Sequence, residues 1–260
     1  MKTLAEFVRA TPFWVIAHRG ASGEAPENTL AAISKAISDG AQMIEIDIQA
    51  TKDEELIVFH DHVLGRTTNG SGHVRQKTFE DIKGLDAGSW FDARYAGEPI
   101  PRLDEVLDLM QGKAYLNLEI KPLKDDPNAA RMITQAMNVI QEHDMENFTV
   151  YASFDHNALR LVKNIDPLAH TVALNVPGDS RLPSQVVADC DADAYGCSIH
   201  ELTKKKSEDL AANRIPWGVY TVNTPEQLST ALQYGAQSVV SNQPGLVWQA
   251  YTAQNKPPTP

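Results

Sequence analysis

Eight short apolar segments recur along the chain, and a stretch with helical character separates most neighbouring pairs. Each segment has the length and composition of a buried strand. Strands that alternate with helices form a parallel sheet, and eight such units predict a closed (β/α)₈ TIM barrel. A doubly wound sheet is the competing fold, but the sequence lacks its glycine-rich phosphate loop. The expected strands are WVIAH (14–18), MIEIDI (43–48), AYLNLEI (114–120), FTVYAS (148–153), HTVALNV (170–176), AYGCSI (194–199), PWGVYTV (216–222) and QSVVSN (237–242).

One segment breaks this alternation. LIVFHD (56–61) follows the second expected strand after a connection too short for a parallel crossover, so it should run back antiparallel. Such a return strand would bring His60 beside Glu45 and Asp47. The polar, glycine-containing stretch from about 62 to 101 then fits no barrel unit, and it is expected to form a small inserted subdomain within a single domain, 1–260.

The charge of the chain limits its partners. The 260 residues carry a formal net charge of -11, which disfavours general binding to nucleic acid or to an anionic membrane surface. No apolar run reaches membrane-spanning length, so no stable membrane insertion is expected. Glu6 and Arg9 interrupt the place where a secretory signal would need an apolar core, and the chain is therefore predicted to be cytoplasmic. The spacing of Cys190 and Cys197 does not suggest a zinc site.

Carboxylates gather at the expected carboxyl ends of two strands. Glu45 and Asp47 are two residues apart and share one face of a strand, and Glu119 and Lys121 repeat that spacing on the next barrel strand. Three carboxylates pointing into one barrel mouth repel one another unless a cation neutralises them. Ligation by oxygen alone favours Mg²⁺ or Ca²⁺ over zinc.

Two histidines and two cations accompany these carboxylates. His18 and Arg19 end the first expected strand, His60 lies on the return strand, and Lys121 follows Glu119. A divalent ion with Arg and Lys suits the charge of a phosphodiester, while paired imidazoles supply a base and an acid near neutral pH. The pattern therefore predicts phosphodiester cleavage.

Motifs along the whole barrel resemble those of the glycerophosphodiester phosphodiesterase family. They are AHRGASGEAPENT, EIDIQATKD, VFHD, LNLEIKP and YTVN, in the family's order and spacing. The stretch after VFHD is similar to the family's insertion domain. The combination of CSIH and YTVN is most similar to the cytoplasmic bacterial members that serve glycerol 3-phosphate uptake.

The resemblance implies a role for each matching residue. Metal binding falls to Glu45, Asp47 and Glu119, acid/base catalysis to His18 and His60, and phosphate binding to Arg19 and Lys121. Glu27 and Asn28 match the family's ENT motif, which supports the site, and Phe154, Tyr220 and Asn223 would contact the glycerol moiety. Asn242 stands where many relatives have Asp, which leaves the role of the last strand open.

The implied reaction is hydrolysis of glycerophosphodiesters to glycerol 3-phosphate and an alcohol, with a divalent cation, Mg²⁺ or Ca²⁺, as cofactor. A lysophospholipase D or related phospholipase of the same fold is an alternative, and it would need an apolar groove for the acyl chain. A non-catalytic barrel that binds phosphodiesters is an alternative of another class. It should lack a histidine or a metal carboxylate, and none is missing here. The head group, the ion, the nucleophile, the division of acid and base between the histidines and the oligomeric state stay open.

Overall fold

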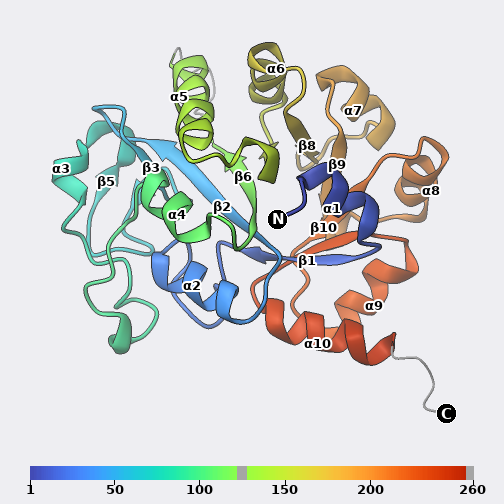
Figure 1. Cartoon of the computed structure of the whole chain (residues 1–260), viewed down its shortest axis with the longest axis horizontal. Helices are drawn as coiled ribbons and strands as arrows, with labels where there is room; N and C mark the ends of the chain where they lie inside the picture. The colour runs from blue at the N-terminus through green and yellow to red at the C-terminus, as the bar shows by residue number, and fades with distance from the viewer. Residues whose placement is uncertain (122–127, 256–260) are drawn as a thin grey trace.

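Parallel strands close into an eight-stranded barrel in the computed structural model, which describes residues 1–121 and 128–255 (Figure 1). The first strand pairs with both the second and the last strand of the barrel, and these two contacts close the ring. All eight strands expected from the sequence are present. They are β1 (Trp14–His18), β2 (Met43–Ala50), β6 (Tyr115–Ile120), β7 (Thr149–Ser153), β8 (His170–Leu174), β9 (Ala194–Ser198), β10 (Trp217–Tyr220) and β11 (Ser238–Ser241).

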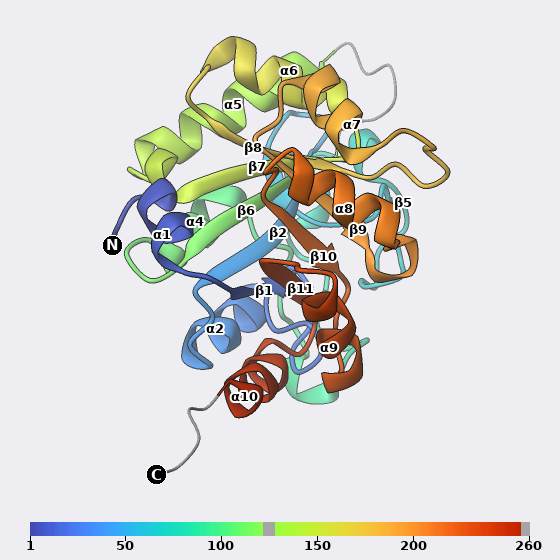
Figure 2. The same cartoon turned by 90° about the vertical axis from the view of Figure 1, so that its right-hand side faces the viewer.

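Helices surround the barrel and connect its strands (Figure 2). Four of the barrel helices begin at a Thr or Asp side chain that caps the first turn, namely Thr29, Asp155, Thr203 and Thr224. None of the helices in the described part of the chain combines the length and apolar character needed to cross a membrane. The barrel helices are α2 (Leu30–Ser38), α4 (Leu103–Met110), α5 (Ala129–Glu142), α6 (His156–Ile165), α7 (Pro183–Cys190), α8 (Lys204–Ala212), α9 (Pro225–Gln233) and α10 (Pro244–Gln254).

Strand β3 (Leu56–Val58) is the antiparallel return that the sequence predicts. It pairs with the end of β2, with Val58 opposite Ile48. Beyond the pairing, the Phe59 N–H donates to the Asp47 carbonyl oxygen at 2.9 Å, which carries His60 to the side of Asp47. This close antiparallel contact explains how a residue outside the barrel strands reaches the barrel mouth.

The stretch from 62 to 101 follows this return strand and packs around its own small cluster of buried apolar side chains, including Leu64, Val74 and Ile82. It lies at one end of the barrel (Figure 2). Its elements are β4 (Val63–Leu64), β5 (Gly72–His73), α3 (Phe79–Ile82) and the 3₁₀ turns η1 (Val74–Gln76) and η2 (Ala93–Tyr95).

A short first helix, α1 (Leu4–Ala10), lies at the opposite end of the barrel from β5 (Figure 2). Thr3 and Glu6 form a reciprocal capping box that starts it. Its buried Phe7 stacks on Tyr115, with ring centroids 4.4 Å apart, and meets Trp14 edge-on at 5.6 Å. The helix was not among the sequence expectations. It covers the end of the barrel where the strands begin.

Candidate active site

Alternation along β2 sends its apolar and acidic residues to opposite faces. Ile44, Ile46 and Ile48 are fully buried in the cluster shared with the surrounding helices, so Glu45 and Asp47 point into the barrel. Asp47 pairs in register with Glu119 on the neighbouring β6. Glu45, Asp47 and Glu119 are all buried, and each offers an oxygen within 4.8 Å of those of the other two.

Two cations lie against these carboxylates. Lys121, directly after β6, places its Nζ 2.5 Å from Glu119 Oε1 and 3.1 Å from Asp47 Oδ1. The Arg19 Nε lies 3.2 Å from Asp47 Oδ2 on the other side. Three buried carboxylates thus face two cations, and the group has more acidic than basic members.

The pKa values of the carboxylates reflect this imbalance. Burial and the charges of Asp47 and Glu119 raise the pKa of Glu45 well above its usual value. Burial and Asp47 raise the pKa of Glu119 to about 6, although Lys121 opposes the shift. Burial would raise the pKa of Asp47 as well, but Lys121 and Arg19 lower it to about 2. The excess of negative charge therefore acts most strongly on Glu45, because Lys121 partly offsets it at Glu119.

A hard divalent cation fits this donor set. Glu45 Oε1 is buried and has no hydrogen-bond partner in the described structure, which is costly for a carboxylate oxygen. The three residues offer only oxygen, the ligand atom that Mg²⁺ and Ca²⁺ prefer. Glu45, Asp47 and Glu119 can therefore hold a divalent ion.

His18 is the last residue of β1, and its ring contacts Asn242, which follows the neighbouring strand β11. Its Nδ1 lies 2.6 Å from Asn242 Oδ1, which also accepts from the Ser22 hydroxyl at 3.2 Å. Its Nε2 lies 3.9 Å from Glu45 Oε2. Burial and the charge of Arg19 lower the pKa of His18 to about 4, so the ring is neutral near pH 7. Asn242, whose role the sequence left open, contacts His18.

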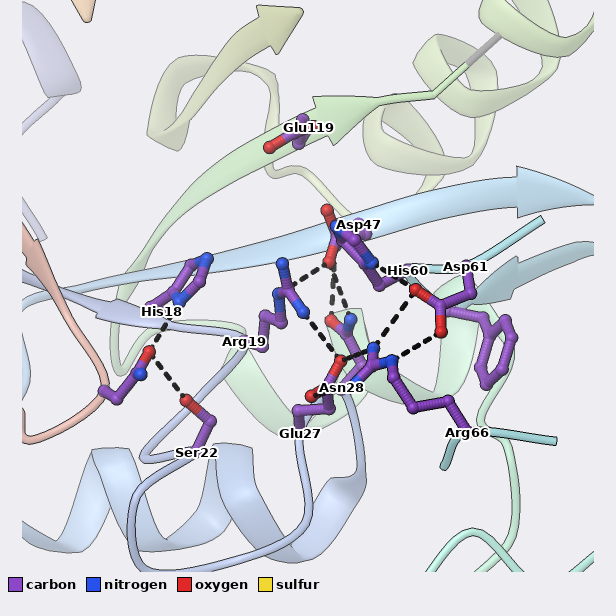
Figure 3. A network of polar contacts seen from close by, with 12 residues as sticks. His18, Arg19, Ser22, Glu27, Asn28, Asp47, His60, Asp61, Arg66 and Glu119 are labelled. Carbon is purple, nitrogen blue, oxygen red and sulfur yellow. Dashed lines mark hydrogen bonds and ion pairs between the residues drawn. The ribbon is translucent and has the colours of Figure 1, made fainter. Parts of the chain in front are cut away.

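The Nδ1 atom of His60 contacts a carboxylate, whereas that of His18 contacts an amide. The His60 Nδ1 lies 2.6 Å from Asp61 Oδ1 (Figure 3). Burial and the charges of Lys121 and Arg19 lower the pKa of His60, while the charge of Asp47 and the hydrogen bond to Asp61 act against that shift. Figure 3 shows His18 and His60 on opposite sides of Arg19, with Asp47 beside His60.

The loop after β1 supports Arg19 and the carboxylates together. Its backbone turns through left-handed conformations at Arg19 (φ 55°) and Asn28 (φ 59°), which residues other than glycine adopt infrequently. The Arg19 N–H donates to Glu45 Oε2 at 2.8 Å, and its Nη1 donates to Glu27 Oε1 at 2.7 Å. Asn28 Nδ2 donates to Asp47 Oδ2 at 2.7 Å. The residues of the ENT motif therefore contact the charged groups directly.

The three residues expected to contact glycerol differ in their surroundings. Phe154 follows β7 and meets Tyr220, the last residue of β10, edge-on with ring centroids 6.0 Å apart. Tyr220 also lines an apolar cavity of about 270 Å³ that extends down the barrel to α1. Asn223 uses its Oδ1 to accept the Asn242 N–H at 2.8 Å, so this oxygen supports the loop that holds His18.

Three further residues near the site were not singled out from the sequence: Ser22, Asp61 and Arg66. Asp61 follows His60 within VFHD, and its contact with the ring could have been inferred from that adjacency. Arg66 belongs to the stretch expected to be a subdomain, yet it contacts Glu27 across 39 positions of the sequence. Neither composition nor periodicity signals a contact of that range.

Comparison with protein families identifies the chain. The sequence profile of the glycerophosphoryl diester phosphodiesterase family matches residues 18–246, which include every site residue described above. The chain belongs to the glycerophosphoryl diester phosphodiesterase family. This membership agrees with the resemblance found in the sequence motifs, and it makes the protein an enzyme of the glycerophosphodiester phosphodiesterase class.

Relatives of this family match over most of their length. A glycerophosphodiester phosphodiesterase of Caldanaerobacter subterraneus subsp. tengcongensis is 36% identical over 241 residues, covering 88% of this chain and 94% of the relative. A glycerophosphodiester phosphodiesterase of Bacillus subtilis is 31% identical over 245 residues, and the match covers 89% of this chain and 84% of the relative. An Oleispira antarctica phosphodiesterase, solved in complex with the product sn-glycerol-3-phosphate, is 28% identical with a TM-score of 0.87, covering 94% of this chain and 98% of that one.

Proposed function

We propose that this enzyme hydrolyses small glycerophosphodiesters to glycerol 3-phosphate and an alcohol, with a divalent cation held by its carboxylates. One observation carries the proposal: His18, Arg19, His60 and Lys121 lie against a buried group of three carboxylates, which outnumber the two permanent cations. The product bound to the Oleispira antarctica phosphodiesterase supports the same substrate class. The chain acts as one domain, with 62–101 as an insertion beside the site.

Glu45, Asp47 and Glu119 are the residues that would hold the cation, and Mg²⁺ and Ca²⁺ both suit their oxygen ligands. When bound, a divalent ion neutralises the phosphate charge and stabilises the additional charge that develops in the transition state. Lys121 already contacts Glu119 and Asp47, so its ammonium lies where a phosphate oxygen would meet this group.

Arg19 and Lys121 bind the phosphate of the substrate in this proposal. The Arg19 guanidinium is fixed by Glu27 on one side and Asp47 on the other, so its orientation is set before substrate arrives. A preoriented guanidinium donates charge-assisted hydrogen bonds to a phosphate without losing side-chain freedom on binding. Because the net charge of the whole chain is -11, these local cations are what attracts an anionic substrate.

His18 is the general base in this assignment. Asn242 Oδ1 can only accept, so the proton of neutral His18 resides on Nδ1 and the Nε2 lone pair is free. The pKa of about 4 keeps the ring in this neutral form at working pH. His18 would therefore remove a proton from the attacking hydroxyl, whether that of water or of the glycerol moiety.

His60 is then the general acid. Its Nδ1 donates to the Asp61 carboxylate, and a negative charge at that position stabilises a protonated ring. The opposite nitrogen, Nε2, is the one available to protonate the leaving alkoxide. We base this division of roles on the partners of the two histidines: His18 contacts the Asn242 amide, and His60 contacts the Asp61 carboxylate.

A product assay tests the proposed function. Purified enzyme with Mg²⁺ or Ca²⁺ is incubated with glycerophosphocholine, glycerophosphoethanolamine or lysophosphatidylcholine, and the products are separated and identified. We expect glycerol 3-phosphate and the free alcohol from the first two, and much lower kcat/KM on the acylated substrate. Equal or faster cleavage of lysophosphatidylcholine would instead establish the phospholipase alternative, and tight binding of a glycerophosphodiester without turnover would establish a non-catalytic barrel.

A further inference from the structure

Arg66 lies between Glu27, in the loop after β1, and Asp61, which follows His60. It follows β4 in the insertion, and its guanidinium donates to two carboxylates at once. The Nη1 and Nη2 atoms bond to the two oxygens of Glu27 at 2.9 and 2.7 Å. The Nε and Nη2 atoms bond to the two oxygens of Asp61 at 2.5 and 3.2 Å.

Each of these carboxylates also holds one residue of the proposed mechanism. Glu27 Oε1 accepts from Arg19 Nη1 at 2.7 Å and from Arg66 Nη2 at 2.7 Å. Asp61 Oδ1 lies 2.6 Å from His60 Nδ1 and 3.2 Å from Arg66 Nη2. A continuous chain of contacts therefore runs from Arg19 through Glu27, Arg66 and Asp61 to His60 (Figure 3).

The contacts of Arg66 differ from an ordinary surface ion pair in their geometry. Exposed pairs contribute little to stability, about 0–1 kcal/mol, unless they are bidentate or part of a network. Arg66 is bidentate on both sides, and its partners Glu27 and Asp61 are mostly buried. A lysine could not reproduce this contact, because a single ammonium lacks the planar fork that engages two carboxylates.

We infer that Arg66 is a positioning residue that fixes the phosphate-binding Arg19 and the proton-donating His60 relative to each other. The insertion thereby takes part in the reaction through one side chain, although it supplies none of the groups that touch the substrate. This inference rests on the proposed function, because it assumes the roles given to Arg19 and His60. Arg66→Ala should leave His18 and the three proposed metal-binding carboxylates in place, while it frees the side chains of Glu27 and Asp61 to turn away.

Kinetics of Arg66→Ala and Arg66→Lys test the inference. Wild-type turnover of glycerophosphocholine is measured first, so that failure of the proposed function is seen separately. We expect both variants to lower kcat at least tenfold with KM within about threefold, because a misplaced group costs rate even when the substrate still binds. Arg94→Gln, in the same insertion with a mostly exposed side chain, is the matched control and should keep wild-type kcat.

Chemical rescue and a spectroscopic measurement complete the test. The Arg66 side chain is 46% exposed, so added guanidinium ion can enter the gap left in Arg66→Ala and should restore part of kcat, whereas ammonium should not. Independently of turnover, ¹⁵N NMR should show His60 with its proton on Nδ1 in the wild type and a mixture of tautomers in Arg66→Ala. Wild-type kcat in both variants, or an unchanged His60 tautomer, would overturn the inference. Arg66→Lys keeps the test valid if Arg66→Ala fails to fold.

Discussion

At the scale of single residues, the two histidines should be separately essential. His18→Ala and His60→Ala each remove one proton transfer, so each should lower kcat by about 10²–10⁴-fold with a modest change in KM. Because both act in one reaction, the double variant should lose much less than the product of the two effects. Steady-state kinetics decide this, with His73→Ala on exposed β5 as the control. A loss of less than about threefold at either position would make that histidine structural.

Asn242 offers a pH-dependent test of the role given to His18. A base must be neutral to act, so kcat/KM should fall at pH values below the pKa of His18, which burial and Arg19 lower to about 4. Asn242→Asp places a negative charge at Nδ1, raises that pKa and should move the acidic limb of the profile to higher pH by about one unit or more. Asn242→Ala removes a hydrogen bond that raises the pKa, so the limb should move to lower pH. A limb that stays in place in both variants would contradict the assignment.

The sequence predicts these residues to different extents. The two-residue spacing of Glu45 and Asp47 was enough to place both on one face, because strand alternation is a local property. The contact of Asn242 with His18 spans 224 positions and depends on the closing pair β1 and β11, so motif spacing alone could not supply it. Arg66 was missed for the same reason, since its partner Glu27 precedes it by 39 positions.

At the scale of elements, sequence periodicity predicted the barrel strands and the return strand but missed α1. Strand β1 is a run of apolar residues that ends at His18, and β2 alternates isoleucine with acidic residues, so both give a local signal. Helix α1 has only seven residues, and most of its stabilisation comes from burial of Leu4 and Phe7 against the barrel. Its capping box, Thr3 with Glu6, was the available signal.

Because of this packing, we expect α1 to affect the stability of the barrel and not the rate of catalysis. Phe7→Ala removes a buried ring that stacks on Tyr115, so it should lower the free energy of unfolding by about 3–5 kcal/mol and the Tm by roughly 10 °C. Because α1 lies at the far end of the barrel from the insertion, kcat of the folded enzyme should stay within about twofold of wild type. Calorimetry and kinetics measure the two effects, with the highly exposed Leu168→Ala as a neutral control. An unchanged Tm would show that α1 does not stabilise the barrel.

At the scale of the whole molecule, the residues that stabilise the barrel and the residues of the candidate site lie in different places. Apolar clusters fill the spaces between strands and helices, while charged side chains collect where the carboxyl ends of β1, β2 and β6 meet the insertion. Three carboxylates of a chain with net charge -11 thus lie where the proposed anionic substrate would bind. An anionic substrate would be attracted only if the positive charges of Arg19, Lys121 and a bound cation together exceed the negative charges of the three carboxylates.

Metal dependence therefore tests the central claim most directly. Turnover of glycerophosphocholine is measured after exhaustive chelation, after return of Mg²⁺ or Ca²⁺, and in Glu119→Gln, whose metal affinity is determined by titration calorimetry. We expect turnover to vanish on chelation and to return with the ion, and Glu119→Gln to bind the ion more weakly while it keeps the wild-type fold by circular dichroism. Full turnover in excess chelator would contradict the account, because the buried carboxylates would then have no part in catalysis as metal ligands.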